Sequence, residues 1–217
     1  MGEDINTLTY RSSKAIEHYS KNTYITGIEK KIIKKYFRGK ILDLGCGCGR
    51  TTKYISDQKF DVVGVDITTE LICKGKELYP ELDLRAGDAV RLEFDSKTFD
   101  IVFFSFNGLD YIYPEERRLL ALREMARVTK KEGFVIFSSH NIKTIILRPK
   151  FILRNLIKRK LFSKYKSCAV SFGELNTHYD SPKNIVKSVL ENTNLKFVEL
   201  ARTGLFDPYP HFIFQSI

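Results

Sequence analysis

The residues best suited to bind a cofactor form a glycine-rich loop after a short apolar run. The run 40–44 leads into Gly45-Cys46-Gly47-Cys48-Gly49, and residues with helical spacing follow the loop. Glycines let a ligand approach the backbone closely, and the first turn of a helix offers unpaired N–H groups. The G-x-G-x-G spacing differs from the G-x-G-x-x-G spacing of dinucleotide sites, so it disfavours an NAD-dependent dehydrogenase.

Three acids stand near the ends of apolar runs and extend this site. Asp43 precedes the first glycine by two residues, where a carboxylate would repel a pyrophosphate but attract an ammonium or sulfonium group. Asp66 ends the next run, where an acid can accept both hydroxyls of a ribose, and Asp88 follows a third run. A single strand-end aspartate often only caps a helix. Together, the acids and the loop favour a cationic nucleotide that carries an amino acid.

These residues need a sheet whose strands end at one edge. Apolar runs predict strands over 40–44, 60–66, 82–86, 99–104 and 133–137, and helical spacing predicts helices over 70–78 and 114–128. The alternation predicts right-handed βαβ units, hence an α/β fold with a doubly wound, mostly parallel sheet. Two successive runs, 195–200 and 211–215, follow a helix at 182–191 and predict an antiparallel edge hairpin, which makes seven strands.

The combined motifs resemble a known family. Ile41–Gly49, Gly64–Asp66, Ala86–Ala89 and Phe99–Val102 are similar to the motifs of class I S-adenosylmethionine-dependent methyltransferases, most closely the small-molecule "type 11" group. The resemblance covers roughly residues 38–140. It implies a Rossmann-like fold, S-adenosylmethionine as the cofactor and S-adenosylhomocysteine as the product.

The resemblance also implies a role for each matching residue. The methionine part of the cofactor would face Asp43 and the loop residues Gly45, Cys46, Gly47 and Gly49. Asp66 would hold the ribose, and the adenine would contact Ile67, Gly87, Asp88 and Ala89. Ser105, Phe106 and Asn107, just after the fourth strand, would line the pocket where the methyl group is delivered.

Methyl transfer from a sulfonium depends mostly on alignment, and needs a general base only for an acceptor of high pKa. His140, at the end of the fifth strand, and His178, late in the insertion, are the predicted catalytic bases; His18 and His211 are weaker candidates. Tyr10 and Tyr19 suit an N-terminal lid. The segment 105–108 lacks the Asn/Asp-Pro-Pro-aromatic signature and the Pro-Cys pair of related enzymes, which leaves hydroxyl, carboxyl, simple amine or carbon acceptors.

A basic insertion follows the predicted core. Residues 143–166 contain nine Lys and Arg and no acid, and Pro149 can start a helix with Ile152, Leu153, Leu156 and Ile157 on one stripe. Three interpretations stay open. The favoured one is a lid whose apolar stripe covers the active site. The others are peripheral docking on an anionic membrane to reach a lipid-linked acceptor, and contact with RNA, which the lack of interleaved aromatics weakens.

Length and composition predict one globular domain. The 217 residues divide into a helical flank or lid (1–39), a cofactor-binding core (40–140), the basic lid insertion (141–180), and a helix with the edge hairpin (181–217). A net charge of +10 favours anionic partners, and four cysteines without a disulfide or metal pattern, with no leader or membrane-span pattern, predict a cytoplasmic protein that needs no metal.

We therefore expect methyl transfer from S-adenosylmethionine to an oxygen or nitrogen of a small or glycan-like acceptor. A loose resemblance of the C-terminal third to methyltransferases of polysaccharide and natural-product pathways supports this acceptor class. The alternatives are an RNA or lipid-linked acceptor, and a protein that binds S-adenosylmethionine without catalysis.

Overall fold

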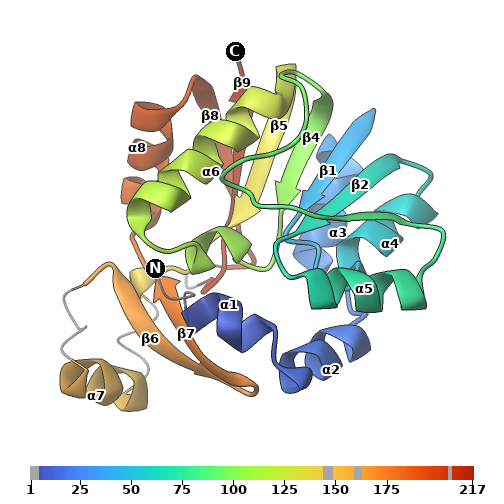
Figure 1. The fold of residues 1–217 in the computed structure, drawn as a ribbon. Coiled ribbons are helices and arrows are strands. Elements are labelled where there is room, and N and C mark those ends of the chain that lie inside the picture. The colour runs from blue at the N-terminus through green and yellow to red at the C-terminus, as the bar shows by residue number, and fades with distance from the viewer. Residues whose placement is uncertain (1–4, 144–148, 159–162, 205–206) are drawn as a thin grey trace.

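The computed structural model describes residues 5–143, 149–158, 163–204 and 207–217. Its centre is a seven-stranded sheet in the order β3-β2-β1-β4-β5-β9-β8 (Figure 1). The strands are β1 (Lys40–Leu44), β2 (Asp61–Asp66), β3 (Asp83–Ala86), β4 (Phe99–Phe104), β5 (Thr129–Ser138), β8 (Leu195–Ala201) and β9 (His211–Ser216). The first five strands pair in parallel, and β9 runs antiparallel to both β5 and β8. The predicted fold class and edge hairpin are confirmed.

Helices cover both faces of the sheet. The strand residues are apolar on both sides, as central parallel strands require. On one face, α6 (Glu115–Val128) and α8 (Pro182–Asn192) pack on side chains such as Val102 and Phe137. On the other face, α3 (Gly27–Tyr36) and α4 (Arg50–Asp57) pack on the alternate residues, such as Ile101 and Ile136. A further helix, α5 (Thr69–Leu78), packs on β2 and β3.

Helix ends follow the local sequence. Ser181 caps α8 by accepting from the backbone N–H of Asn184, with Pro182 in the first turn as predicted. Thr26 and Glu29 form a reciprocal capping box at the start of α3. Because Glu29 has this second role at the cofactor loop, the cap also fixes a residue of the site.

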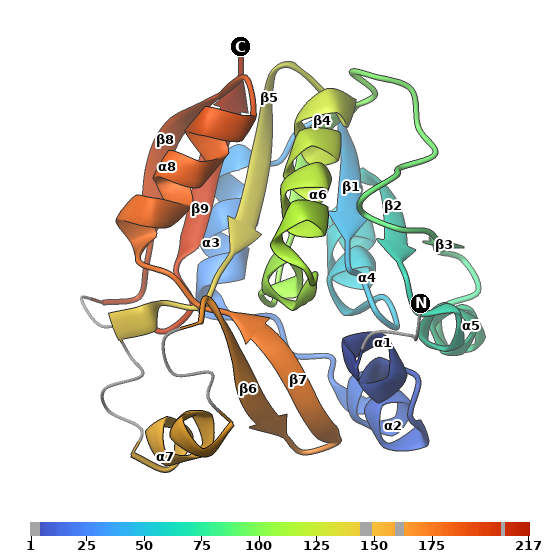
Figure 2. The same cartoon turned by 60° about the vertical axis from the view of Figure 1, so that its left-hand side comes forward.

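A third layer lies beyond the carboxyl ends of the parallel strands. It holds α1 (Ile5–Tyr10), α2 (Ser13–Lys21), α7 (Pro149–Ile157) and a hairpin of β6 (Tyr165–Val170) and β7 (Gly173–His178) (Figures 1 and 2). We call this layer the cap. The N-terminal flank thus forms three helices where two were predicted, and the β6–β7 hairpin in the insertion was not predicted. No helix among the described residues is long and apolar enough to cross a membrane.

Candidate cofactor site and its cap

A cavity of about 560 Å³ lies between the sheet edge and the cap. Its size suits a cofactor together with part of a small acceptor. The lining includes most of the predicted cofactor residues, namely Gly45, Cys46, Gly47, Asp66, Ile67, Gly87, Asp88, Ala89, Ser105 and Phe106. Asp43, Gly49 and Asn107 were predicted too, but they are not among the lining residues.

The glycine loop turns sharply at the edge of the cavity. Gly45, Gly47 and Gly49 have φ angles of 67°, 56° and 90°, in the left-handed region that favours glycine. A Cβ at Gly45 would lie 2.3 Å from the ring of Phe104, whereas one at Gly47 would meet only Tyr19, at 4.0 Å. Gly45 is therefore required for packing, while Gly47 leaves open space on the cavity side. Gly49 begins α4 and packs toward Leu84, which explains its place outside the lining.

Asp66 occupies the position expected of a ribose-binding acid. Its Oδ2 accepts from the N–H of Gly47 at 2.9 Å, and its Oδ1 accepts from the N–H of Thr68 at 2.8 Å. Burial raises the pKa of this carboxyl, although both hydrogen bonds favour its ionised form. A carboxylate held by two backbone groups at the cavity wall keeps further lone pairs for two ligand hydroxyls.

Asp88 closes the neighbouring part of the cavity. Its Oδ2 lies 2.5 Å from a guanidinium nitrogen of Arg117, a lining residue from α6. Its Oδ1 accepts from the N–H of Val90 at 3.1 Å. Ile67, 47% exposed, lines the same cavity and offers an apolar surface for a base. Arg117 carries no sequence signal, since it contacts Asp88 only through the packing of α6.

Asp43 lies beneath the glycine loop instead of facing the cavity. Its Oδ2 accepts from the hydroxyls of Thr51 and Thr52, both at 2.6 Å, so the carboxyl ties β1 to the start of α4. Its buried Oδ1 has no hydrogen-bond partner among the described residues. Burial raises the pKa of Asp43 to about 6, against the effect of the two threonines. The predicted direct contact with the methionine part does not follow from this placement.

A second buried pair braces the loop from the other side. The guanidinium of Arg50 lies 2.7 Å from an oxygen of Glu29 and 4.4 Å from the ring centre of Phe106. Glu29 also accepts from the hydroxyl of Ser105. Burial would raise the pKa of Glu29, but Arg50 and these hydrogen bonds lower it to about 2. The pair joins α3, the loop and the end of β4, and sequence reasoning missed it because its members lie in different elements.

Tyrosines form the roof of the cavity. The ring of Tyr10 lies 5.8 Å from those of Tyr19 and Tyr111, and all three line the cavity. Burial raises the pKa of Tyr10 and Tyr111 well above the usual value, and that of Tyr19 to about 12. The hydroxyls therefore stay protonated at neutral pH. The prediction that Tyr10 and Tyr19 belong to a lid agrees with this arrangement.

His140 and His178 lie behind the roof and do not line the cavity. The Nδ1 atoms of His140 and His178 lie 2.9 Å and 3.6 Å from the Asp110 carboxylate. Burial would raise the pKa of Asp110, but the two histidines hold it well below its usual range. Asp110 belongs to a short 3-10 helix, η1 (Gly108–Tyr111), which also carries Tyr111. The histidines were predicted to face the acceptor, and the structure places them against the Asp110 carboxylate instead.

The two weaker histidine candidates have other surroundings. His18 packs on Tyr19 and Phe172, outside the cavity lining. His211 is buried, and burial lowers its pKa to about 4. Neither position offers a base to an acceptor in the cavity.

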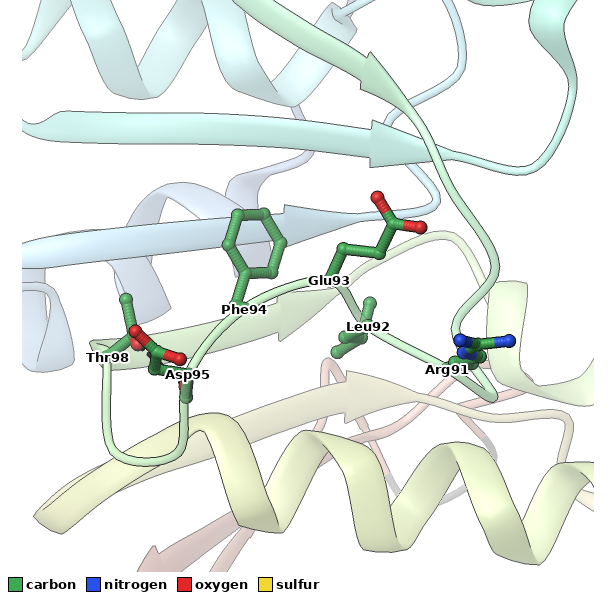
Figure 3. Close-up of a pocket in the computed structure, with 6 residues that line it drawn as sticks. All are labelled: Arg91, Leu92, Glu93, Phe94, Asp95 and Thr98. Atoms are coloured by element: carbon green, nitrogen blue, oxygen red, sulfur yellow. Dashed lines mark hydrogen bonds between the residues drawn. The ribbon is translucent and has the colours of Figure 1, made fainter.

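Another hollow lies on the connection between β3 and β4. Figure 3 shows its lining residues, Arg91, Leu92, Glu93, Phe94, Asp95 and Thr98, all from this one loop. Arg91 lies at one end, with Asp95 and Thr98 at the other. Since none of the cofactor motifs contributes to it, this hollow is separate from the site described above.

An open α/β sheet with a cofactor-sized cavity outside the carboxyl ends of its strands defines a protein that binds a nucleotide cofactor. Residues 41–133 match a family model described as a methyltransferase domain. The fold is similar to the crystal structure of a SAM-dependent methyltransferase from Methanosarcina mazei, with a TM-score of 0.73 and 18% identity, covering 86% of this chain and 97% of that one. The chain belongs to the class I S-adenosylmethionine-dependent methyltransferases.

Sequence relatives place the chain in the same family. An uncharacterized protein of Methanocaldococcus jannaschii is 33% identical over 159 residues, 71% of this chain and 57% of the relative. A demethylmenaquinone methyltransferase of Beutenbergia cavernae is 38% identical over 45% of this chain and 39% of its own length. A phosphatidylethanolamine N-methyltransferase of Cereibacter sphaeroides is 34% identical over 47% of this chain and 51% of its own length. The matches thus span about half the length of these relatives or less.

The cavity fits S-adenosylmethionine, the cofactor of this family. Gly47 leaves space for a ligand against the loop, and Asp66 and Asp88 offer carboxylates to its ribose and adenine. The buried Oδ1 of Asp43, which lacks a partner in the described part of the chain, adds negative charge beneath the loop. This charge suits a ligand with an ammonium and a sulfonium group.

Proposed function

We propose that this protein transfers a methyl group from S-adenosylmethionine to an oxygen or nitrogen of a small acceptor. The observation that carries the proposal is one cavity that combines the glycine loop, two acids and a roof of tyrosines. The residues 1–39 and 141–180 would cover the core as a cap, and residues 181–217 would complete the sheet.

The acceptor end of the cavity is mostly aromatic and apolar. Beyond the cofactor residues, the lining includes Tyr10, Tyr19, Tyr111, Ile112 and Tyr113. The lining cations Arg50 and Arg117 are paired with Glu29 and Asp88. This lining favours a small acceptor with an apolar body over a polyanion such as RNA. Two relatives are named for demethylmenaquinone and phosphatidylethanolamine, and both names support an acceptor with apolar character.

When bound, S-adenosylmethionine supplies a methyl group on a positively charged sulfur, and the acceptor atom takes the methyl as the carbon–sulfur bond breaks. The protein's contribution is to position the reactants and exclude water. The glycine loop and Asp66 would hold the cofactor, and the tyrosine roof would close over the reacting atoms. Alignment of this kind supplies a large part of the rate enhancement in such displacements.

The surroundings of the roof bear on the acceptor atom. The tyrosines have raised pKa values, and the predicted bases His140 and His178 contact Asp110 behind the roof. No ready general base therefore stands at the acceptor end within the described residues. This favours an atom that is nucleophilic without one, such as an amine nitrogen or an acidic hydroxyl. We assign the two histidines to positioning η1 and Tyr111.

The first test measures cofactor binding by calorimetry with S-adenosylhomocysteine. Asp66→Asn should weaken binding at least about tenfold, because a charged acceptor of two hydroxyls becomes a neutral one. Asp61→Asn is the matched control, since Asp61 is exposed at the opposite end of the same strand. NADH should give no heat. Equal affinity of the Asp66 variant and the parent would contradict the assigned site.

The second measurement separates catalysis from cofactor binding alone. Labelled S-adenosylmethionine is incubated with a cell lysate and the parent protein, with the Asp66→Asn variant as a blank. Label should enter a small product with the parent only. A protein that binds S-adenosylhomocysteine but produces no labelled product would be a non-catalytic binder.

A further inference from the structure

Helix α7 carries an apolar stripe on its solvent side. Leu153, Leu156 and Ile157 are 60%, 50% and 74% exposed. The opposite side of the helix holds it to the cap: Asn155 is fully buried and exchanges two hydrogen bonds with the backbone of Ser167 in β6. The usual orientation of an amphipathic helix in a globular protein is therefore reversed. The predicted placement of this stripe over the active site is wrong.

A row of cations runs beside the stripe. Lys150, Arg154 and Lys158 are spaced four residues apart, so they share one side of the helix, and residues 149–158 contain no acid. Lys150 and Lys158 are exposed, and Lys158 pairs with Glu174 of β7. The neighbouring side chains Leu153 and Ile157 are also four residues apart and lie next to this row. The exposed face of α7 is thus an apolar stripe with a basic border.

We propose that this face of α7 docks on the surface of an anionic lipid bilayer. Apolar side chains of such a helix enter the boundary between headgroups and acyl chains, while lysines and arginines at its edge contact anionic headgroups. The charge is complementary, since the whole chain carries +10. An RNA backbone would have no use for the three apolar side chains, and a second copy of the same face would bring its cations against these.

The position of α7 relates docking to the cavity. Both ribbon views place α7 on the same side of the sheet as α1, α2 and the β6–β7 hairpin (Figures 1 and 2). Docking through α7 would bring the cap, which covers the cavity, to the membrane. An acceptor dissolved in the bilayer would then be close to the site. The docking itself does not depend on methyl transfer and goes beyond the function proposed above.

The test is flotation of the full chain with vesicles. One set contains phosphatidylglycerol mixed with phosphatidylcholine, and the other contains phosphatidylcholine alone. The parent should bind the anionic vesicles roughly tenfold more tightly or better. Leu153→Ser with Ile157→Ser, and Lys150→Glu with Arg154→Glu, should each lose at least roughly tenfold of that affinity.

Matched controls come from α8, which lies on a face of the sheet. Lys183→Glu with Lys187→Glu repeats the charge change at the same spacing on exposed residues, and Leu190→Ser alters a side chain that is 46% exposed. Both controls should float like the parent. Every variant should keep its affinity for S-adenosylhomocysteine, so a failure of docking is distinguishable from a failure of the proposed function.

Three results would overturn the proposal. The first is a parent that does not bind anionic vesicles, or α8 controls that lose as much binding as the α7 variants. The second is a parent that dimerises in sedimentation and becomes monomeric with Leu153→Ser and Ile157→Ser, since the stripe would then join two copies. The third is tight binding of tRNA that only the Lys150 and Arg154 changes abolish.

Discussion

At the scale of single residues, the site depends on buried groups whose charge is set by their surroundings. The most direct case for a stability measurement is His211 at the start of β9. It is 5% exposed, neither ring nitrogen has a hydrogen-bond partner among the described residues, and burial lowers its pKa to about 4. A histidine in an unfolded chain has a pKa of about 6.5.

This difference predicts a specific pH dependence of folding. Between about pH 6.5 and about pH 4, the unfolded chain binds a proton at His211 that the folded chain does not bind, so stability falls as the pH falls. From about pH 7 to about pH 4.5 the loss should be about 2 kcal/mol from this group. His211→Gln, which cannot titrate, should show a pH dependence smaller by that amount in urea unfolding. Identical slopes for variant and parent would contradict the burial of a neutral imidazole.

The comparison with a variant is needed because another residue acts in the opposite direction. The folded-state pKa of Asp43 is raised to about 6, above its unfolded value, so this carboxyl makes folding more favourable as the pH falls toward about 4. The parent's own profile therefore sums two opposed contributions. The difference between His211→Gln and the parent isolates one of them.

Individual site residues were predictable only where a motif places them. Asp66 and Asp88 follow strands, and their side chains line the cavity as their positions predicted. Glu29 and Arg50 were not predictable, because their ion pair exists only once α3 packs beside the loop. The histidines failed for a similar reason, since nothing near His140 or His178 in the sequence indicates that Asp110 contacts both.

At the scale of elements, one asparagine attaches the first helix of the cap. The amide of Asn6 donates to the carbonyl oxygens of Tyr111, at 2.6 Å, and Asn176, at 2.8 Å. Its Oδ1 accepts from the N–H of Asn176 at 2.7 Å. These bonds join α1 to η1 and β7. They therefore hold Tyr10 in place above the cavity.

Loss of this attachment should loosen the roof. In Asn6→Ala, the three hydrogen bonds are absent, which should favour opening of α1 and increase the dissociation rate of S-adenosylhomocysteine about tenfold. Stopped-flow displacement measures this rate. Lys21→Ala in α2 is the control, because its ion pair with Glu17 is exposed and of little consequence. An unchanged dissociation rate in Asn6→Ala would show that α1 does not retain the ligand.

The core elements were predictable and the insertion was not, for a physical reason. Strands buried on both faces are continuous apolar runs, so β1, β2 and β4 are visible in the sequence. In the β6–β7 hairpin, Ser167 and Thr177 are fully buried, so the apolar and polar residues do not alternate as they would on a simple strand. The same hydrogen bonds from Asn155 to Ser167 turn α7 around, which explains why its apolar stripe does not face the protein.

At the scale of the whole molecule, the positive charge, the exposed stripe of α7 and the aromatic cavity favour the same class of acceptor. The stripe would bring the cap to a bilayer, and the lining of Tyr10, Tyr19, Tyr111 and Ile112 would accept an apolar body. Neither feature is needed for a water-soluble sugar. The glycan-like acceptor expected from the sequence is therefore the less favoured of the small acceptors.

This combination predicts where a transferred methyl group goes. With labelled S-adenosylmethionine and membranes from the cells that make the protein, most of the label should partition into the organic phase on extraction, because the acceptor is apolar. Asp66→Asn should abolish the label in every fraction. Leu153→Ser with Ile157→Ser should lower it roughly tenfold with intact membranes, yet leave it unchanged when the acceptor is dispersed in detergent, because docking is then no longer required. Label that stays in water-soluble products would keep the methyltransferase and refute the apolar acceptor, and label in tRNA would place the acceptor among polyanions.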